Sequence, residues 1–521
     1  MSSSWDDKYA RLRKRFATRH PPPYRNEETF MVPPYLKRVK PCMYTAQTVS
    51  LGLNSTRLEP GIERYKAEFQ RCFLKWKIGA TSLSACQNNS EKIARLAAIS
   101  PAYERNTEIC YYNPNLVDDC CPDLGNTWDL FIEDLALDMD VRTAYRWYEI
   151  DTSPVNPIIL KTFLALDALF LVLFLRYSYE THAYPPLPEM FYRELHTQAL
   201  YRLLAESRSG IWRDVFLLEN QIPLHILSKV WILMPDMENR KKEEADDLFN
   251  NLLRTVVTDR YLQLFQSDSN GEMVVTKALQ DKWFLDCDHL LDCFHYVVCY
   301  SPPNDIHKAP PLADEKALAP ANTIPSAVQL REVGIHLNSD GCVFVHQTKF
   351  VDNFWDGAVL HLPKLCISDQ TESLLRNLAV FEMVSCHQYP YRPRVGPRLF
   401  TVTSFLILMD KLIQSKKDVE LLRKDDIIIN CLGSNGEMCH MWNSLCKGFS
   451  IYPNPQWVDM LNCLTLRYKN RKYQLYAEFR AEYFKRPWVV ASWGAGVVLL
   501  VVTALQTIYT VVSYYLPPTP Q

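Results

Sequence analysis

The densest group of residues capable of chemistry is a polar cluster inside an apolar run, residues 214–227. Glu219, Asn220 and Gln221 stand together, and His225 follows shortly after them. A carboxylate and an imidazole beside one cleft could act as a general acid–base pair, with Asn220 as a hydrogen-bond donor. This hypothesis also needs a nucleophile or a metal ion, and the sequence indicates neither.

The same cluster has a structural interpretation, which we favour. Pro223 has no backbone N–H, so a helix should end or restart at this position. Glu219, Asn220 or Gln221 would then cap exposed backbone amides, and a carboxylate is favourable at a helix N-terminus. A polar surface that binds a partner or a ligand is the third alternative.

A second cluster of candidate ligands spans residues 287–299. On a helix, two sets of side chains that can bind zinc would each share a face: His289, Asp292 and Cys293, and His295 and Cys299. The cysteine spacing does not match a zinc finger, and the intervening apolar residues form an ordinary amphipathic pattern. We therefore favour core packing and predict no metal, cofactor or catalytic residue.

Composition and missing motifs narrow the function classes. The sequence contains no G-x-S-x-G, P-loop, H-E-x-x-H or C-x-x-C motif. The net charge is −2 and no nucleic-acid recognition module is present, so we expect no nucleic-acid partner. The sequence leaves enzymatic activity open and favours its absence.

The elements that must position these residues are mostly helices. The 48% content of hydrophobic residues is ample for a large core, and we predict a mainly α fold with a small β-sheet insertion, an α+β class, plus one C-terminal transmembrane helix. We expect six parts: a disordered basic and proline-rich arm (1–40), a helical first half (41–301), a proline-rich linker (302–325), a second half with short strands and then helices (326–486), a transmembrane helix (487–515) and a short tail (516–521).

Local patterns predict several individual elements. Residues 163–175 are intensely apolar but short, which indicates a buried core helix rather than a membrane span. Short β-branched runs predict strands at 334–338, 342–351 and 359–367. Asp369 to Glu372 reads as a capping box, and 419–432 as a helix that Gly433 would end.

The longest apolar segment lies near the end of the chain. Residues 487–521 contain no Asp, Glu, Lys or Arg, and the 24-residue run 489–512 would span ~36 Å as a helix. Aromatic residues typical of a membrane interface lie at both ends of this run: Trp488, Trp493, Tyr514 and Tyr515. This pattern predicts a single-pass, C-terminal membrane anchor.

The residues before the span indicate its orientation. Residues 467–486 contain seven basic and two acidic side chains, ending in Lys485 and Arg486. Because basic residues favour the cytoplasmic side, we expect the large domain in the cytosol, on a plasma membrane or endomembrane. The expected partners are the lipid bilayer and a protein of unknown identity, with homo-oligomerisation through the span as a further expectation.

Several ordered motifs resemble one plant family. LLENQIP at 217–223 resembles the family catalogued as domain of unknown function 247, also called uncharacterised protein family 0481. Further matches follow in the family's order at Asp167–Phe170, His289–Asp292, Arg376–Leu378 and Glu382, before the terminal span. His225 departs from the family, which usually has an apolar residue there.

The resemblance implies a plant protein with a C-terminal membrane helix and no assigned activity. It implies a shared structural role for the matching residues: Asp167, Glu219, Asn220, Gln221, Pro223, Arg376, Asn377 and Glu382. We expect a non-catalytic interaction or signalling protein. The alternatives are a self-incompatibility recognition determinant, as in a branch of the family in grasses, and an unrecognised enzyme that uses the Glu219–His225 region.

Overall fold

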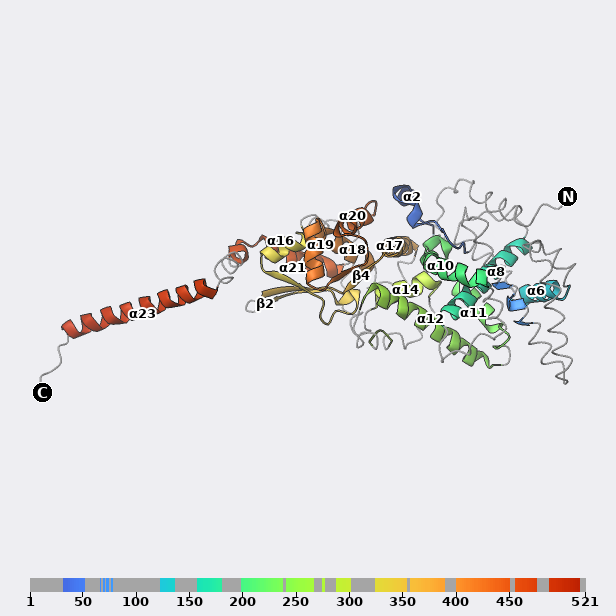
Figure 1. Ribbon diagram of the computed structural model, residues 1–521, viewed down its shortest axis with the longest axis horizontal. Helices are drawn as coiled ribbons and strands as arrows, with labels where there is room; N and C mark the ends of the chain where they lie inside the picture. The colour runs from blue at the N-terminus through green and yellow to red at the C-terminus, as the bar shows by residue number, and fades with distance from the viewer. Residues whose placement is uncertain are drawn as a thin grey trace.

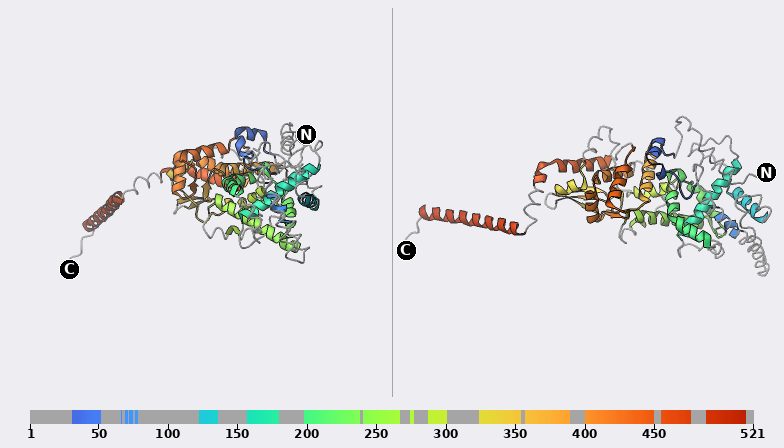
Figure 2. Two further views of the ribbon diagram at one scale, coloured as in Figure 1. Left: turned by 45° about the vertical axis from the view of Figure 1, so that its right-hand side comes forward. Right: turned by 45° about the horizontal axis from the view of Figure 1, so that its top comes forward.

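Helices form most of the architecture, as the sequence predicts. The computed structural model describes residues 31–51, part of 66–77, 122–135, 157–179, 198–237, 240–266, 274–276, 287–300, 324–353, 357–388, 400–449, 455–475 and 487–515. The helices of the first half lie at the end of the molecule nearest the N-terminus, and the second half follows along the long axis (Figure 1). Helix α23, Pro487–Tyr515, projects at the opposite end in all views (Figures 1 and 2).

The first half is built around a buried helix, α8. Residues 164–175 of this helix are at most 5% exposed, which confirms a core helix rather than a second span. It packs against α11, and α11 packs against α12. The elements described in this half are α2 (Pro34–Val39), η1 (Pro41–Met43), α6 (Pro122–Asp134), α8 (Pro157–Ser178), α10 (Gln198–Val215), η2 (Leu218–Asn220), α11 (Leu224–Ile232), α12 (Lys242–Leu264) and α14 (Leu290–Val298).

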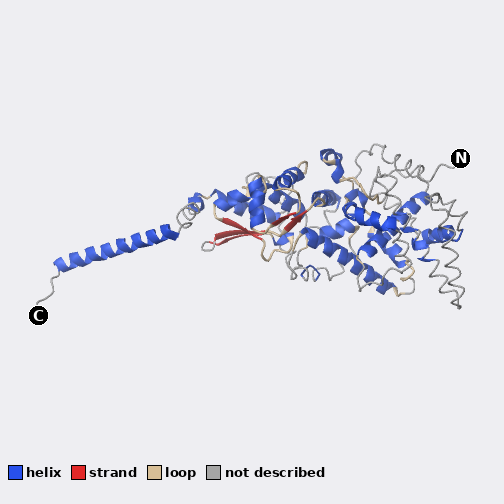
Figure 3. Ribbon diagram, in the orientation of Figure 1, coloured by secondary structure: helices blue, strands red, loops and turns tan. Residues whose placement is uncertain are grey.

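The second half contains two small sheets flanked by helices (Figure 3). One sheet has the order β1-β3-β2, with β1 parallel and β2 antiparallel to β3, and the other pairs β4 and β5 in parallel. The elements described are α16 (Ala327–Glu332), β1 (Ile335–Asn338), η5 (Val345–Gln347), β2 (Lys349–Asn353), β3 (Gly357–His361), β4 (Leu365–Ile367), α17 (Thr371–Gln388), α18 (Thr401–Leu412), α19 (Lys416–Lys424), β5 (Ile428–Asn430), α20 (Asn435–Leu445) and α21 (Pro455–Lys469).

The predicted helix at 419–432 is wrong in its second half. Helix α19 ends at Lys424, and Asp426 has a left-handed φ of 55°. The following isoleucines instead form β5, because Leu365 donates to the Ile427 carbonyl at 2.8 Å and pairs the segment with β4. Gly433 therefore follows a strand and does not end a helix.

The predicted strand at 342–351 is also only partly correct. A 3₁₀ turn, η5, occupies its middle, and β2 begins at Lys349. The Gln347 side-chain oxygen accepts hydrogen bonds from the backbone of Val343 and Phe344, at 2.7 and 2.9 Å. These bonds offer the backbone a local alternative to a sheet partner.

Candidate functional site

The polar motif residues converge on one segment, residues 31–51, which we call the N-terminal strap. The sequence predicted that its first ten residues would belong to a disordered arm, but α2 lies within them and Val32 and Leu36 are buried. The sequence pattern did not reveal this buried segment, because its buried side chains are few and widely spaced among basic and proline residues. The strap crosses the region where the two halves meet.

Glu219 and Asn220 hold the two ends of the strap. The Glu219 carboxylate accepts from the Val32 amide at 2.9 Å and from the Lys37 ammonium at 2.5 Å. The Asn220 side chain accepts from the Leu51 amide at 2.6 Å and donates to the Val49 carbonyl at 3.1 Å. Burial raises the pKa of Glu219, and the adjacent Lys37 opposes that rise.

Asp214 holds the middle of the strap. One of its carboxylate oxygens accepts from three successive backbone amides, those of Gln47, Thr48 and Val49, at 2.9, 2.5 and 3.0 Å. Burial raises the pKa of this carboxyl group, while Arg213 and the three amides oppose the rise. This acidic group binds backbone rather than facing a cavity.

Helix α17 of the second half contacts both the motif and the strap. Asn377 accepts from the Leu218 amide at 2.9 Å and donates to the Met43 carbonyl at 3.0 Å. Glu372 pairs with Lys40 of the strap at 2.5 Å and with Arg376 at 2.9 Å. The structure thus brings Asn377 to the 217–223 motif and joins the two halves of the chain.

Two predicted motif residues organise nearby helix ends. The Gln221 oxygen accepts from the Leu291 amide at 3.0 Å, so this side chain serves the first turn of α14. Pro223 precedes α11 and leaves that helix without a side-chain cap. The helix restarts after Pro223 as expected, but the amide that Gln221 caps belongs to a helix 70 residues later.

Asp167 forms a separate buried ion pair. Its carboxylate contacts the Lys66 ammonium, and both side chains are at most 1% exposed. Lys66 also donates to the Ser50 carbonyl in the strap. The pair therefore connects helix α8 to the strap from the other side.

Arg376 and Glu382 form hydrogen bonds with the ends of helices that come later in the chain. The Arg376 guanidinium donates to the Leu445 and Ser444 carbonyls at the end of α20, at 3.1 and 2.7 Å. Glu382 accepts from the Val402 and Thr403 amides at 2.8 Å each. These two amides open α18, whose own N-cap position has no side-chain hydrogen bond.

Glu382 also joins His295 and Cys299 of α14. The Glu382 Oε1 atom lies 3.1 Å from His295 Nε2 and 3.7 Å from Cys299 Sγ, and Nε2 and Sγ are 3.3 Å apart. Burial alone lowers the pKa of His295, but Cys299 and Glu382 outweigh it and raise that pKa well above its usual value. Sequence reasoning placed His295 and Cys299 on one face but could not supply Glu382.

The geometry gives no support to Glu219 and His225 as an acid–base pair. Glu219 is 8% exposed and contacts the strap, whereas His225 is exposed. Sequence reasoning did not select Lys37, Lys66 or Asp214 as partners in this region. Asp214 opens the polar and apolar run 214–227, but nothing in the sequence shows that it binds the strap.

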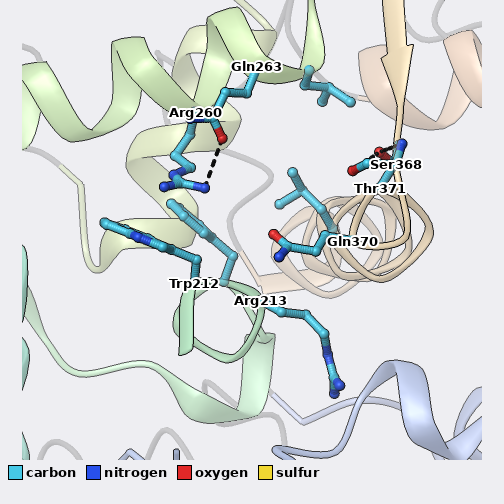
Figure 4. Close-up of a pocket in the computed structure, with 10 residues that line it drawn as sticks. Trp212, Arg213, Arg260, Gln263, Ser368, Gln370 and Thr371 are labelled. Carbon is cyan, nitrogen blue, oxygen red and sulfur yellow. Dashed lines mark hydrogen bonds between the residues drawn. The ribbon is translucent and has the colours of Figure 1, made fainter. Parts of the chain in front are cut away.

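One cavity in the described part of the chain lies among α10, α12 and the start of α17 (Figure 4). Its volume is about 50 Å³, far below the ~300–1,000 Å³ of typical small-molecule sites. Arg260 stacks on Trp212 at 4.0 Å and donates to Gln263 at 2.9 Å. Arg213 points away from the cavity and donates to the Thr45 carbonyl (Figure 4).

Helix α23 has the length and composition to cross a membrane. Its segment Ala491–Ser513 has a mean hydropathy of 2.1, and none of its most apolar window is buried. Trp488, Trp493 and Tyr515 are exposed near its ends. The side chain of Tyr514 and the basic pair Lys485 and Arg486 lie outside the described residues.

Comparisons with known proteins agree with the ordered motifs. A stretch of 212 residues is 26% identical to the UPF0481 protein At3g02645 of Arabidopsis thaliana. The alignment covers 41% of this chain and 36% of that protein. UPF0481 protein At3g47200 of the same plant is 28% identical over 115 residues, or 22% of this chain and 24% of the relative. The matches thus span about a third or less of each relative.

The family comparison covers more of the chain, and no solved structure matches it significantly. The matching family model, DUF247, is described as a plant protein of unknown function and aligns with residues 29–502. This range contains the strap, the polar motif, both halves and the first part of α23. The chain belongs to the DUF247 family of plant proteins.

Proposed function

We propose that this chain is a membrane-anchored interaction or signalling protein without catalytic activity. The observation that carries the proposal is α23, whose apolar residues 497–502 are all about half exposed or more. A helix of this kind buries its surface in a bilayer or against another protein. The anchor would hold the α+β domain at a membrane surface.

The use of the polar motif supports a role without catalysis. Asp214, Glu219 and Asn220 bind the backbone and Lys37 of the strap, and Asn377 binds it from the second half. Buried polar side chains that satisfy backbone groups stabilise one conformation. We infer that these residues keep one rigid surface in shape for a protein partner.

The orientation follows from charge. The basic residues at 467–486 favour the cytosolic side, so the domain would face the cytosol, α23 would cross the membrane and residues 516–521 would lie on its other side. Protease treatment of sealed microsomes, with one tag at each end of the chain, tests this orientation. Protection of only the C-terminal tag supports it, whereas protection of the N-terminal tag reverses it.

A partner test separates an interaction protein from an enzyme. Cross-linking in intact membranes should join the domain to a defined protein through residues of the 31–475 region. Helix α23 could instead pair with a second copy, since Ala491/Ala495 and Ser492/Gly496 permit close helix packing. A chain that stays uncross-linked in its native membrane would contradict the proposed interaction role.

A further inference from the structure

A trio of side chains at the junction of α14, α17 and α18 has the donor set of a metal site. His295 and Cys299 are four residues apart on α14 and therefore share a face, and Glu382 reaches them from α17. These three form the group of candidate ligands whose donor atoms all lie within 4.8 Å of one another. Cys299 and Glu382 are buried, and His295 has 12% of its side chain exposed.

The distances among the donor atoms match three corners of a zinc tetrahedron. Zinc bonds of about 2.0 Å to nitrogen or oxygen and about 2.3 Å to sulfur place N and O about 3.3 Å apart and S about 3.5 Å from either. The observed N–O, N–S and S–O separations are 3.1, 3.3 and 3.7 Å. Each observed separation is within about 0.2 Å of the corresponding tetrahedral value.

The surroundings also suit a bound cation. Glu382 Oε1 accepts from the Val402 amide, and Oε2 accepts from the amide and hydroxyl of Thr403, at 2.8, 2.8 and 2.7 Å. Metal-binding carboxylates are commonly fixed by such outer hydrogen bonds. Zinc sites with three protein ligands commonly take a water molecule as the fourth ligand.

We propose that His295, Cys299 and Glu382 bind one Zn²⁺ ion that joins α14 to α17 and to the start of α18. The mixture of imidazole, thiolate and carboxylate favours zinc over Mg²⁺ or Ca²⁺, which prefer oxygen ligands. Binding releases the thiol proton of Cys299 and any proton on His295 Nε2, because both donor atoms must be unprotonated. The site is independent of the membrane anchor.

The test uses the full chain purified in detergent, stripped with a chelator and then titrated with Zn²⁺ or Co²⁺. We expect one zinc per chain, a thiolate-to-cobalt absorption band in the near ultraviolet, and a higher melting temperature with zinc. Cys299→Ala and His295→Arg should each reduce bound zinc at least tenfold and abolish the cobalt band. His295→Arg keeps a cation beside Glu382, so it separates loss of metal from loss of the ion pair.

Two matched controls exclude binding by other cysteines. Cys293→Ala changes a buried thiol on the same helix, and Cys366→Ser/Cys431→Ser removes a pair of thiols 3.6 Å apart elsewhere. Both controls should retain the zinc and the cobalt band. Wild-type protein that takes up no zinc, or a folded His295→Arg or Cys299→Ala variant that binds as much as wild type, would overturn the proposal.

Discussion

At the scale of single residues, buried polar side chains fix the position of the strap, which apolar packing alone would leave undefined. Asp214, Asn220 and Asn377 each bind backbone groups of the strap. A buried polar group without a partner is costly, so these side chains select one path for the strap. These contacts explain why Glu219, Asn220 and Gln221, the polar residues within the apolar run, are buried.

Asn220→Ala tests this explanation. The change removes the acceptor of the Leu51 amide and the donor to the Val49 and Asp214 carbonyls. We expect the free energy of unfolding to fall by about 3 kcal/mol, because buried partners lose their hydrogen bonds. Denaturant unfolding of the detergent-solubilised chain measures the loss, and the exposed Asn251→Ala change should cost less than about 0.5 kcal/mol.

The Lys66–Asp167 pair allows a double-mutant cycle. Asp167→Leu alone leaves the buried Lys66 ammonium without its carboxylate partner, and we expect a loss of about 3–5 kcal/mol. Adding Lys66→Met should recover much of that loss, because it removes the buried charge. A double variant whose loss equals the sum of the two single losses would show that the pair is not coupled.

At the scale of elements, close packing of α10 against the strap sets a second constraint. An added Cβ at Gly210 would lie 2.1 Å from Thr48 Oγ1 and 3.0 Å from Thr48 Cβ. We expect Gly210→Ala to lower stability by about 1–3 kcal/mol despite the better helix propensity of alanine. Gly494→Ala has no atom within 4 Å of the new Cβ, so its melting temperature should match the wild type.

The sequence predicted the elements whose signals are local. The core helix α8 and the helix restart after Pro223 follow from apolar length and a missing N–H. It did not predict β5, because the isoleucines at 427–429 continue a helical pattern in the sequence and their strand partner, β4, lies 63 residues earlier. Secondary structure that depends on distant pairing is outside the reach of local patterns.

The candidate site was likewise only partly predictable from the sequence. The family motifs identified Glu219, Asn220, Asn377 and Glu382, but these side chains also bind partners as far as 187 residues away in the sequence. Lys37 resembles an ordinary solvated lysine in the sequence, and Glu382 stands 87 residues from His295. Residue type indicated which side chains matter, and only the fold shows what they bind.

At the scale of the whole molecule, a helical domain with two small sheets carries one unburied apolar helix. The domain's polar motif is used internally, and most of the exposed large hydrophobic side chains of the described residues belong to α23. Membrane attachment is therefore the property on which the proposed function depends.

Charge substitution within α23 tests that attachment most directly. Val501→Arg/Val502→Arg places two charges near the middle of the span, each costing about 2.5–3.5 kcal/mol in a bilayer. The matched control is Val501→Leu/Val502→Leu, and the measurement is alkaline carbonate extraction of membranes that contain each chain. We predict that the wild type and the leucine variant stay in the membrane pellet and the arginine variant moves to the supernatant; a wild-type chain released by carbonate would contradict the account.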